Sequence, residues 1–329
     1  MSLQGIRATR VRKVFDDGNH DAFTDLCRFR NRLFLAFRSC PDGHGVHSTS
    51  RIVVLSSTDG EEWEQSFEFS VAGRDTRDPH FLVFKDRIFV YTGCWAVPSD
   101  GAELDLNQHM GFCAYSSDGR LWSGPVPLEG THGHYIWRAA CYRSNAYLCG
   151  RRRRNFKLLS PGESDPESIE AALLVSRDGL VWKFNSLMTP TYGDETALLF
   201  DEGGRLMCIA RGSGGNPASL CRSKPPYREW SRVHLGRNLG GPLIAMWGDR
   251  YIIGGRDTTD PASPKTKLFW LQGDRLKEAA VLPSAGDNSY PGFVALDEEN
   301  ALLSYYSTHE DIDRGPSATS IYLATLCAR

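Results

Sequence analysis

The sequence lacks the features that would send a chain into or through a membrane. It contains no run of about 18 apolar residues, and residues 1–15 lack the apolar centre of a signal peptide. We therefore expect a cytoplasmic chain that does not contact a membrane. Its net charge is only −2, from 38 basic and 40 acidic residues, so no overall field would attract it to nucleic acid. Any ionic ligand must be recognised by a few local side chains.

Helical periodicity and metal-binding spacings are absent as well. Apart from a short turn near residues 165–172, no segment has the apolar spacing of a helix. The nine cysteines are an odd number, and most lie in apolar runs typical of strands, which favours free thiols in a reducing compartment. Because no Cys-x-x-Cys pair or Cys/His cluster has zinc spacing, we expect no metal ion and no cofactor.

What the sequence does contain is a repeated hairpin pattern. Residues 192–211 show it most clearly, with two short apolar runs on either side of an Asp-Glu-Gly-Gly turn. Similar pairs of runs, each followed by further strand-like segments, begin near residues 26, 80, 138, 242 and 292. Six units of four strands, with a period of about 45–60 residues, predict an all-β, six-bladed β-propeller.

Two further features support a closed ring. Three Ser-x-Asp-Gly-x-x-Trp segments end at Trp63, Trp122 and Trp182, which are 59 and then 60 residues apart. We interpret each as a turn followed by a tryptophan that packs between blades. The sixth unit lacks a fourth strand, whereas residues 7–15 alternate as a strand does. The N-terminal strand should therefore complete the last blade, which removes two open sheet edges and makes residues 1–329 one domain.

Polar side chains gather at the ends of these hairpins. In a propeller the innermost strand of each blade lines the central channel, so hairpin ends should meet at one mouth. If the turn within residues 192–211 centres on Gly203, Glu195 and Arg211 are cross-strand neighbours with Cβ atoms about 5 Å apart. The other residues that we expect at this mouth include His20, Asp21, Asp25, Arg38, Arg74, Asp75, Arg77, Asp78, His132, His134, Arg138, Arg256, Tyr290, Tyr305 and Tyr306.

The same register rule predicts which of these charges have partners. With a turn at residues 31–32, Asp25 faces Arg38 as a second carboxylate–arginine pair. Arg138 and Arg256 would each face a glycine, which leaves both without a partner. Unpaired guanidinium groups suit a carboxylate or other anionic ligand, which they bind through two parallel hydrogen bonds.

These residues resemble a known family. The Ser-x-Asp-Gly-x-x-Trp segments, Glu195 followed by Arg211, Arg256 beyond the fifth hairpin and Ser289-Tyr290 are similar to the sialidase superfamily of six-bladed propellers with Asp-box (BNR) repeats. The resemblance implies that Tyr290 is the nucleophile and Glu195 its general base. It also implies that Arg211 and Arg256 bind the substrate carboxylate and that an aspartate is the acid/base. A phenol with a pKa near 10 is a poor nucleophile unless a neighbouring carboxylate takes its proton.

The sequence departs from the sialidase pattern at the first inner strand. Sialidases have Arg-Ile-Pro there, where residues 22–25 of this chain read Ala-Phe-Thr-Asp, so one arginine of a trio is missing. The candidates to replace it are Arg38, Arg77 and Arg138. The candidates for the acid/base are Asp25, Asp75 and Asp78. Other segments resemble a branch of bacterial sialidase-like propellers classed as glycosidases, and Arg-Asp-Pro at 77–79 resembles a motif of five-bladed glycosidases with an Asp/Asp/Glu set.

We therefore expect an exo-acting glycoside hydrolase that accepts an acidic sugar at the channel mouth. One alternative is a propeller that binds glycans or partners without catalysis, and another is a polysaccharide lyase that uses Tyr and His. A carboxylate set of Asp25, Asp78 and Glu195 is the alternative to Tyr290. The arginine run at residues 151–154 fits a solvated or mouth-facing loop better than a nucleic-acid patch.

Overall fold

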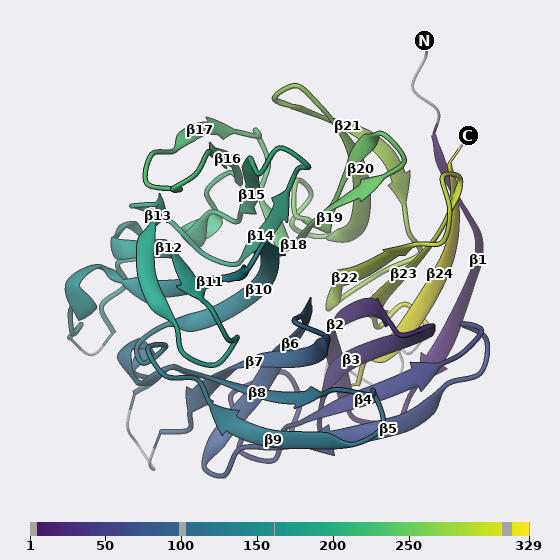
Figure 1. Cartoon of the computed structure of the whole chain (residues 1–329), viewed down its shortest axis with the longest axis horizontal. Helices are drawn as coiled ribbons and strands as arrows, with labels where there is room; N and C mark the ends of the chain where they lie inside the picture. Colours follow the sequence, from purple (N-terminus) through teal and green to yellow (C-terminus); the bar gives the residue numbers. More distant parts are fainter. Residues whose placement is uncertain (1–4, 99–102, 161, 311–317, 329) are drawn as a thin grey trace.

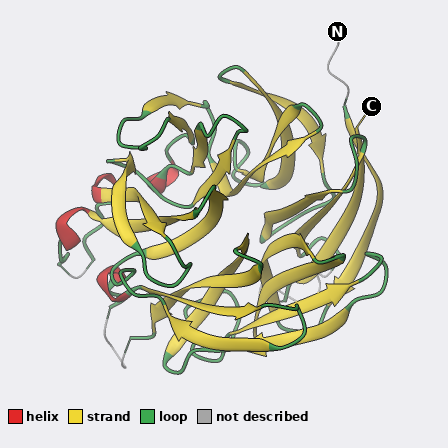
Figure 2. Cartoon of the chain, viewed as in Figure 1, coloured by secondary structure: helices red, strands yellow, loops and turns green. Residues whose placement is uncertain are grey.

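The strands form six separate sheets arranged in a ring. A computed structural model of the chain describes residues 5–98, 103–160, 162–310 and 318–328. Within these residues, 24 strands form six antiparallel sheets of four strands, which stand as blades around a central axis (Figure 1). The helical segments of the described residues are short 3-10 turns (Figure 2), and none could span a membrane. The predicted all-β, six-bladed propeller is confirmed.

Five of the six blades use their four strands in chain order from the axis outward. The inner strands are β2 (His20–Phe29), β6 (Arg74–Phe84), β10 (Tyr135–Tyr142), β14 (Thr196–Phe200), β18 (Leu239–Trp247) and β22 (Asn288–Ala295). The second strands are β3 (Arg32–Cys40), β7 (Arg87–Ala96), β11 (Asn145–Arg153), β15 (Leu206–Ala210), β19 (Arg250–Asp257) and β23 (Asn300–Ser307). The third strands are β4 (Arg51–Ser57), β8 (Met110–Ser116), β12 (Ile169–Ser176), β16 (Ser219–Ser223), β20 (Lys265–Gln272) and β24 (Ser320–Ala328). The outer strands are β5 (Glu64–Phe69), β9 (Trp122–Pro127), β13 (Lys183–Thr189), β17 (Ser231–His234), β21 (Arg275–Val281) and β1 (Ile6–Phe15).

The last blade takes its outer strand from the start of the chain. Strand β1 pairs antiparallel with β24, with Val11 opposite Ala324, and the two strands lie side by side in Figure 1. The first and last strands are thus hydrogen-bonded to each other. This confirms the predicted closure by the N-terminal strand.

Each blade packs against both of its neighbours, so its central strands bury apolar side chains on both faces. In β3, Leu35 and Phe37 belong to one hydrophobic cluster, whereas Phe34 and Ala36 belong to another. Successive side chains of a strand point to opposite faces, and here both faces are fully buried. This explains why the inner half of each blade reads as a continuous apolar run.

The repeated turns form as the sequence predicts. In the first copy, the Ser57 Oγ accepts a hydrogen bond from the Gly60 N–H at 2.8 Å, and Gly60 takes a positive φ of 79°. In the second copy, the Trp122 indole lies parallel to Phe67 of the preceding blade and donates to the Ser66 Oγ at 3.2 Å. These contacts support a structural role for the repeats, as links between neighbouring blades.

Five of the six inner strands contain a β-bulge two to four residues after they begin. A bulge places two residues of one strand against one of its partner, and it can redirect a side chain. Four bulge residues have left-handed backbone with φ between 52° and 61°, namely Phe23, Asp78, Gly241 and Tyr290. The bulges therefore decide which side chains meet near the axis.

Candidate active site at the channel mouth

The ion pair predicted between Glu195 and Arg211 is present. Strand β14 pairs with β15 in regular register, with Thr196 opposite Ala210, so the residues just beyond them also face each other. The Arg211 N–H donates to the Glu195 carbonyl at 2.9 Å, and Arg211 Nη1 lies 3.0 Å from Glu195 Oε2. This is the one inner strand without a bulge, which is why a simple register count succeeds here.

Tyr290 joins this pair from another blade. Its hydroxyl donates to Glu195 Oε1 at 2.6 Å, and Arg211 Nη1 donates to the Tyr290 oxygen at 3.4 Å. The Gly241 N–H donates to Glu195 Oε2 at 2.8 Å. The phenol, the carboxylate and the guanidinium therefore form one hydrogen-bonded group. Together with Arg256, we call Tyr290, Glu195 and Arg211 the tyrosine cluster.

Gly241 leaves the space that Tyr290 fills. Its φ is 58°, and a Cβ atom at this position would lie 2.4 Å from the Tyr290 Cγ. A larger residue would meet both a strained backbone and the ring. The glycine thus allows the Tyr290 ring to approach Glu195.

The protonation of the cluster follows from its burial and its charges. Burial and the adjacent Glu195 carboxylate raise the pKa of Tyr290 well above its usual value, so the resting phenol keeps its proton. Burial would also raise the pKa of Glu195, but Arg211 and the hydrogen bonds from Tyr290 and Gly241 hold it below its usual range. The resting state is therefore a neutral phenol bonded to a charged carboxylate, which can accept the phenol proton.

The predicted pairing of Asp25 with Arg38 is wrong. The bulge at residues 23–24 shifts the register, so that Ala22 lies opposite Arg38 and Asp25 lies opposite Ala36. Arg38 instead bonds Asp75 of the next blade, with Nε 2.9 Å from Oδ1. A single inserted residue thus changes the partner of every side chain before it.

Arg138 was expected to lack a partner, and this is also wrong. It lies in a bulge rather than opposite Gly150, and its Nη1 bonds Asp25 Oδ1 at 2.8 Å. Its other donors bond the carbonyl oxygens of Pro242 at 3.0 Å and Pro291 at 2.5 Å. Burial acts to raise the pKa of Asp25, but Arg138, His80 and the Phe81 N–H together outweigh it and the pKa falls to about 2. The pair is a buried link between blades.

Arg256 also has a partner that the sequence did not indicate. It lies opposite Gly240, one residue before the predicted Gly241, and its Nη1 bonds Asp287 Oδ1 at 3.0 Å. Its guanidinium carbon lies 5.6 Å from the centre of the Tyr290 ring. The side chains of Arg211 and Arg256 remain 27% and 18% exposed, so each keeps a surface that a ligand can contact.

The three candidates for the missing arginine use their guanidinium groups to bond other parts of the chain. Arg38 is fully buried, and its Nη1 and Nη2 donate to the carbonyl oxygens of Gly43 and Gly45 at 3.0 and 2.9 Å. Arg77 is 8% exposed, forms an ion pair with Asp75 Oδ2 at 3.1 Å and donates to the His44 carbonyl at 3.1 Å. With Arg138 also buried, none of the three offers the open guanidinium that a ligand carboxylate needs.

One of the candidate aspartates, Asp78, is held neutral by its burial. Asp75 is fully buried between Arg38 and Arg77, and Asp25 is paired with Arg138. Burial raises the pKa of Asp78 to about 8, although Arg77 opposes it. Within the described residues, Asp78 Oδ1 has no hydrogen-bond partner. Asp78 is thus a protonated carboxyl near Glu195, and its side chain is only 5% exposed.

Comparison with known proteins finds similarity at the level of the fold. No protein-family model and no curated protein matches the chain. A protein of unknown function from Dyadobacter fermentans has a TM-score of 0.80 at 21% identity, over 99% of this chain and 100% of that one. Trypanosoma rangeli sialidase has a TM-score of 0.69 at 12% identity over 97% of this chain, which spans 58% of that enzyme. The Hadza microbial sialidase Hz136 has a TM-score of 0.70 at 15% identity, over 94% of this chain and 66% of that one. The chain has the fold of a sialidase-like propeller.

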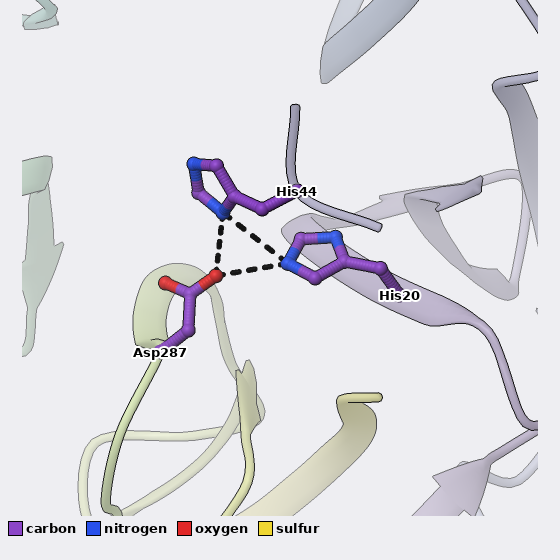
Figure 3. Close-up of side chains that lie close together, drawn as sticks. All are labelled: His20, His44 and Asp287. Carbon is purple, nitrogen blue, oxygen red and sulfur yellow. Dashed lines mark hydrogen bonds and ion pairs between the residues drawn. The ribbon is translucent and has the colours of Figure 1, made fainter. Parts of the chain in front are cut away.

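A second cluster of polar side chains lies beside the tyrosine cluster. Asp287 Oδ2 accepts hydrogen bonds from His20 Nε2 at 2.8 Å and from His44 Nδ1 at 2.6 Å (Figure 3). Asp287 Oδ1 accepts from Arg256 and, at 2.8 Å, from the Tyr306 hydroxyl. Burial alone would raise the pKa of Asp287, but the bonds from both histidines hold it well below its usual range. We call His20, His44 and Asp287 the histidine cluster.

Sequence reasoning placed His20 and Tyr306 at the mouth but missed Asp287 and His44. Asp287 directly precedes β22, the same place relative to its strand that Glu195 has before β14. It was missed because the apolar pattern predicts a sixth hairpin that begins at residue 292, beyond the bulge. His44 lies in the connection between β3 and β4, where no register rule fixes a position.

The histidine cluster has the residue types of a metal site. One ligand atom from each residue lies within 4.8 Å of the others. However, Arg38 Nη1 faces His20 Nδ1 at 3.3 Å, and a guanidinium can only donate. His20 Nδ1 must therefore accept, which leaves the proton on Nε2, the atom that a metal ion would need. The donor set fits hydrogen bonding to Asp287 better than metal binding.

Proposed function

We propose that this sialidase-like propeller is a retaining exo-glycosidase that uses Tyr290 as its nucleophile. The observation that carries this proposal is the bond of 2.6 Å between the Tyr290 hydroxyl and Glu195, with Arg211 within 3.4 Å of the same oxygen. A carboxylate that accepts the phenol proton turns a weak nucleophile into an effective one. Arg211 stabilises the negative charge that develops on the phenol oxygen.

In the first step, the Tyr290 oxygen attacks the anomeric carbon as its proton passes to Glu195. The bond from the anomeric carbon to the leaving-group oxygen breaks, and that oxygen takes the electron pair and a proton. In the second step, water attacks the anomeric carbon and gives a proton to the group that protonated the leaving oxygen, the bond to Tyr290 breaks, and Glu195 returns its proton to the phenol. The sugar is released with its original anomeric configuration.

We further propose that the substrate is a sugar with a carboxylate. Arg211 and Arg256 lie on the tyrosine cluster and retain 27% and 18% exposed side-chain surface. Both are already paired with carboxylates of the chain, Glu195 and Asp287, so a ligand carboxylate would bind their remaining N–H groups. Such charge-assisted bonds contribute about 1.5–3 kcal/mol each.

The test is a panel of aryl sialosides, aryl uronides and matched neutral aryl glycosides. The proposal predicts release of aglycone from an acidic member, and the loss of this activity in Tyr290→Phe. Tyr305→Phe is the matched control, because Tyr305 lies on the neighbouring β23 and its hydroxyl donates to the Pro283 carbonyl, away from Glu195. It should keep full activity.

Other outcomes would replace the proposal. An unsaturated product that absorbs in the ultraviolet, formed without water uptake, indicates a lyase. Binding of the acidic sugars without turnover indicates a glycan-binding module. Turnover that survives in Tyr290→Phe favours the carboxylate set of Asp25, Asp78 and Glu195.

A further inference from the structure

The step proposed for Tyr290 needs a group that delivers a proton to the leaving group and later takes one from water. The leaving group of an exo-acting hydrolase extends toward solvent, so this group must reach the solvent side. Asp78, the neutral candidate among the aspartates, is only 5% exposed. His44 is 51% exposed and belongs to a cluster that adjoins the nucleophile.

Three side chains connect the histidine cluster to the tyrosine cluster. The Phe23 ring lies 5.5 Å from His44 and 4.9 Å from Tyr290, measured between ring centres. Tyr306 lies 5.9 Å from Tyr290 by the same measure and donates to Asp287. Arg256 also contacts both, through Asp287 and the Tyr290 ring. A sugar bound over Tyr290 therefore has His44 within its immediate surroundings.

Asp287 fixes the orientation and tautomer of His44. The carboxylate accepts a hydrogen bond of 2.6 Å from the His44 Nδ1–H, while Figure 3 shows the second ring nitrogen, Nε2, pointing away from the carboxylate. His20, held by Arg38, donates to the same Asp287 oxygen and keeps the carboxylate in place. A histidine with one nitrogen bonded to a carboxylate and the other free can transfer a proton at the free atom.

The backbone around His44 is also immobilised. Arg38 donates to the carbonyl oxygens of Gly43 and Gly45, on either side of His44. Arg77 donates to the His44 carbonyl itself at 3.1 Å. Two buried arginines thus bind three consecutive carbonyl groups of an exposed connection. This arrangement holds His44 more firmly than its exposure alone would suggest, as proton transfer requires.

We propose that His44, oriented by Asp287, is the catalytic acid/base of this propeller, an inference that rests on the proposed function. In the first step, the His44 imidazolium gives its Nε2 proton to the leaving oxygen as the glycosidic bond breaks. The ring is then neutral and still donates its Nδ1–H to Asp287. In the second step, Nε2 takes a proton from the attacking water as the bond from the anomeric carbon to Tyr290 breaks. The imidazolium is then restored for the next cycle.

The experiment compares His44→Ala with His47→Ala, a histidine three residues along in the same connection. Two acidic aryl glycosides are used, one with a dinitrophenyl leaving group and one with an unsubstituted phenyl group. His44→Ala should lose about 10²–10⁴-fold in turnover of the phenyl glycoside, because that group needs a proton. First-step turnover of the dinitrophenyl glycoside should fall far less, and His47→Ala should match the parent on both.

Two further readouts separate a catalytic role from a structural one. Azide attacks without a base, so it should restore turnover of the dinitrophenyl glycoside by His44→Ala and give a glycosyl azide. Prior treatment with a chelator should leave the parent enzyme unchanged. A loss in His44→Ala that is equal for both leaving groups overturns the inference, as does chelator-sensitive turnover. Tyr290→Phe that remains active overturns the proposed function instead, and parent protein that is inactive on the whole panel overturns both.

Discussion

Two arginine–carboxylate pairs lie near the axis, Arg138 with Asp25 and Arg211 with Glu195, and their arginines differ in how fully they are used. Arg138 uses its guanidinium for Asp25 and for two backbone carbonyl oxygens, and only 11% of its side chain is exposed. Arg211 bonds Glu195 and Tyr290 through Nη1, and 27% of its side chain is exposed. The first pair joins blades, whereas the second retains capacity for a ligand.

The difference shows that charge alone does not identify a functional residue in a propeller channel. Every buried charge needs a partner, so ion pairs are expected there whether or not a ligand binds. What distinguishes the tyrosine cluster is a titratable hydroxyl bonded to the carboxylate and donors that remain unused. The predictions below test this distinction by disrupting one pair at a time.

The largest effect should come from the tyrosine cluster. Tyr290→Phe and Glu195→Gln should each lower turnover of an acidic aryl glycoside by at least about 10³-fold, since each removes one half of the nucleophile pair. The double variant should be little worse than either, because residues that act as a unit are not additive. Steady-state kinetics provides the measurement. Losses that multiply in the double variant would show that the two residues act separately.

Arg138→Met should act on stability instead. It leaves the Asp25 carboxylate buried without its cation, so the free energy of unfolding should fall by about 3–5 kcal/mol. Arg211→Met should cost less stability but abolish turnover, because Arg211 is more exposed than Arg138 and bonds the proposed nucleophile. Chemical denaturation and kinetics on both variants provide the test. Asp25→Asn combined with Arg138→Met should recover part of the lost stability, and equal unfolding of the two single variants would remove the distinction.

Arg256→Lys should have an intermediate effect on binding. It retains the charge but loses the planar group that binds a carboxylate through two hydrogen bonds, so affinity for an acidic sugar should weaken by about 1–3 kcal/mol. The Michaelis constant should rise for acidic substrates and stay unchanged for any neutral one. If acidic and neutral sugars are affected equally, Arg256 does not bind the carboxylate.

Asp78→Asn should change how the stability of the chain depends on pH. The pKa of Asp78 is about 8 in the folded chain and 3.8 in the reference state, so the folded chain holds a proton that the unfolded chain releases. The free energy of unfolding therefore falls as pH rises from about 4 to about 8. Asp78→Asn should flatten this slope, while Asp21, whose pKa burial also raises to about 8, retains its own contribution. Thermal or denaturant unfolding at several pH values provides the measurement. If the free energy of unfolding depends on pH in Asp78→Asn as it does in the parent, Asp78 is not the group that holds the proton.

The sequence was sufficient for the fold because its evidence is periodic. The hairpins, the repeated turns and the missing last strand together predict six blades closed by β1. The pair of Glu195 and Arg211 was also predictable, because its hairpin has no bulge. The residues opposite Asp25, Arg138 and Arg256 were predicted wrongly because β2, β10 and β18 each contain one extra residue.

The sequence does contain markers of some of these bulges. Proline is tolerated in strands mainly at edges and bulges, and Pro79, Pro242 and Pro291 each follow a bulge residue with positive φ. Reading these prolines as bulge markers would have corrected the register of three blades. The position of His44 could not be read in this way, because it depends on carbonyl contacts from Arg38 and Arg77 across two blades.

The most direct test of the central claim is to identify the residue that becomes bonded to the sugar. Incubation with 2,3-difluorosialic acid, which carries a carboxylate and slows release of a glycosyl intermediate, should add one sugar to the intact protein. Peptide mapping by mass spectrometry should place it on Tyr290, and Tyr290→Phe should remain unlabelled. Labelling of a carboxylate, or turnover of acidic glycosides with inverted product and no adduct, would contradict the account.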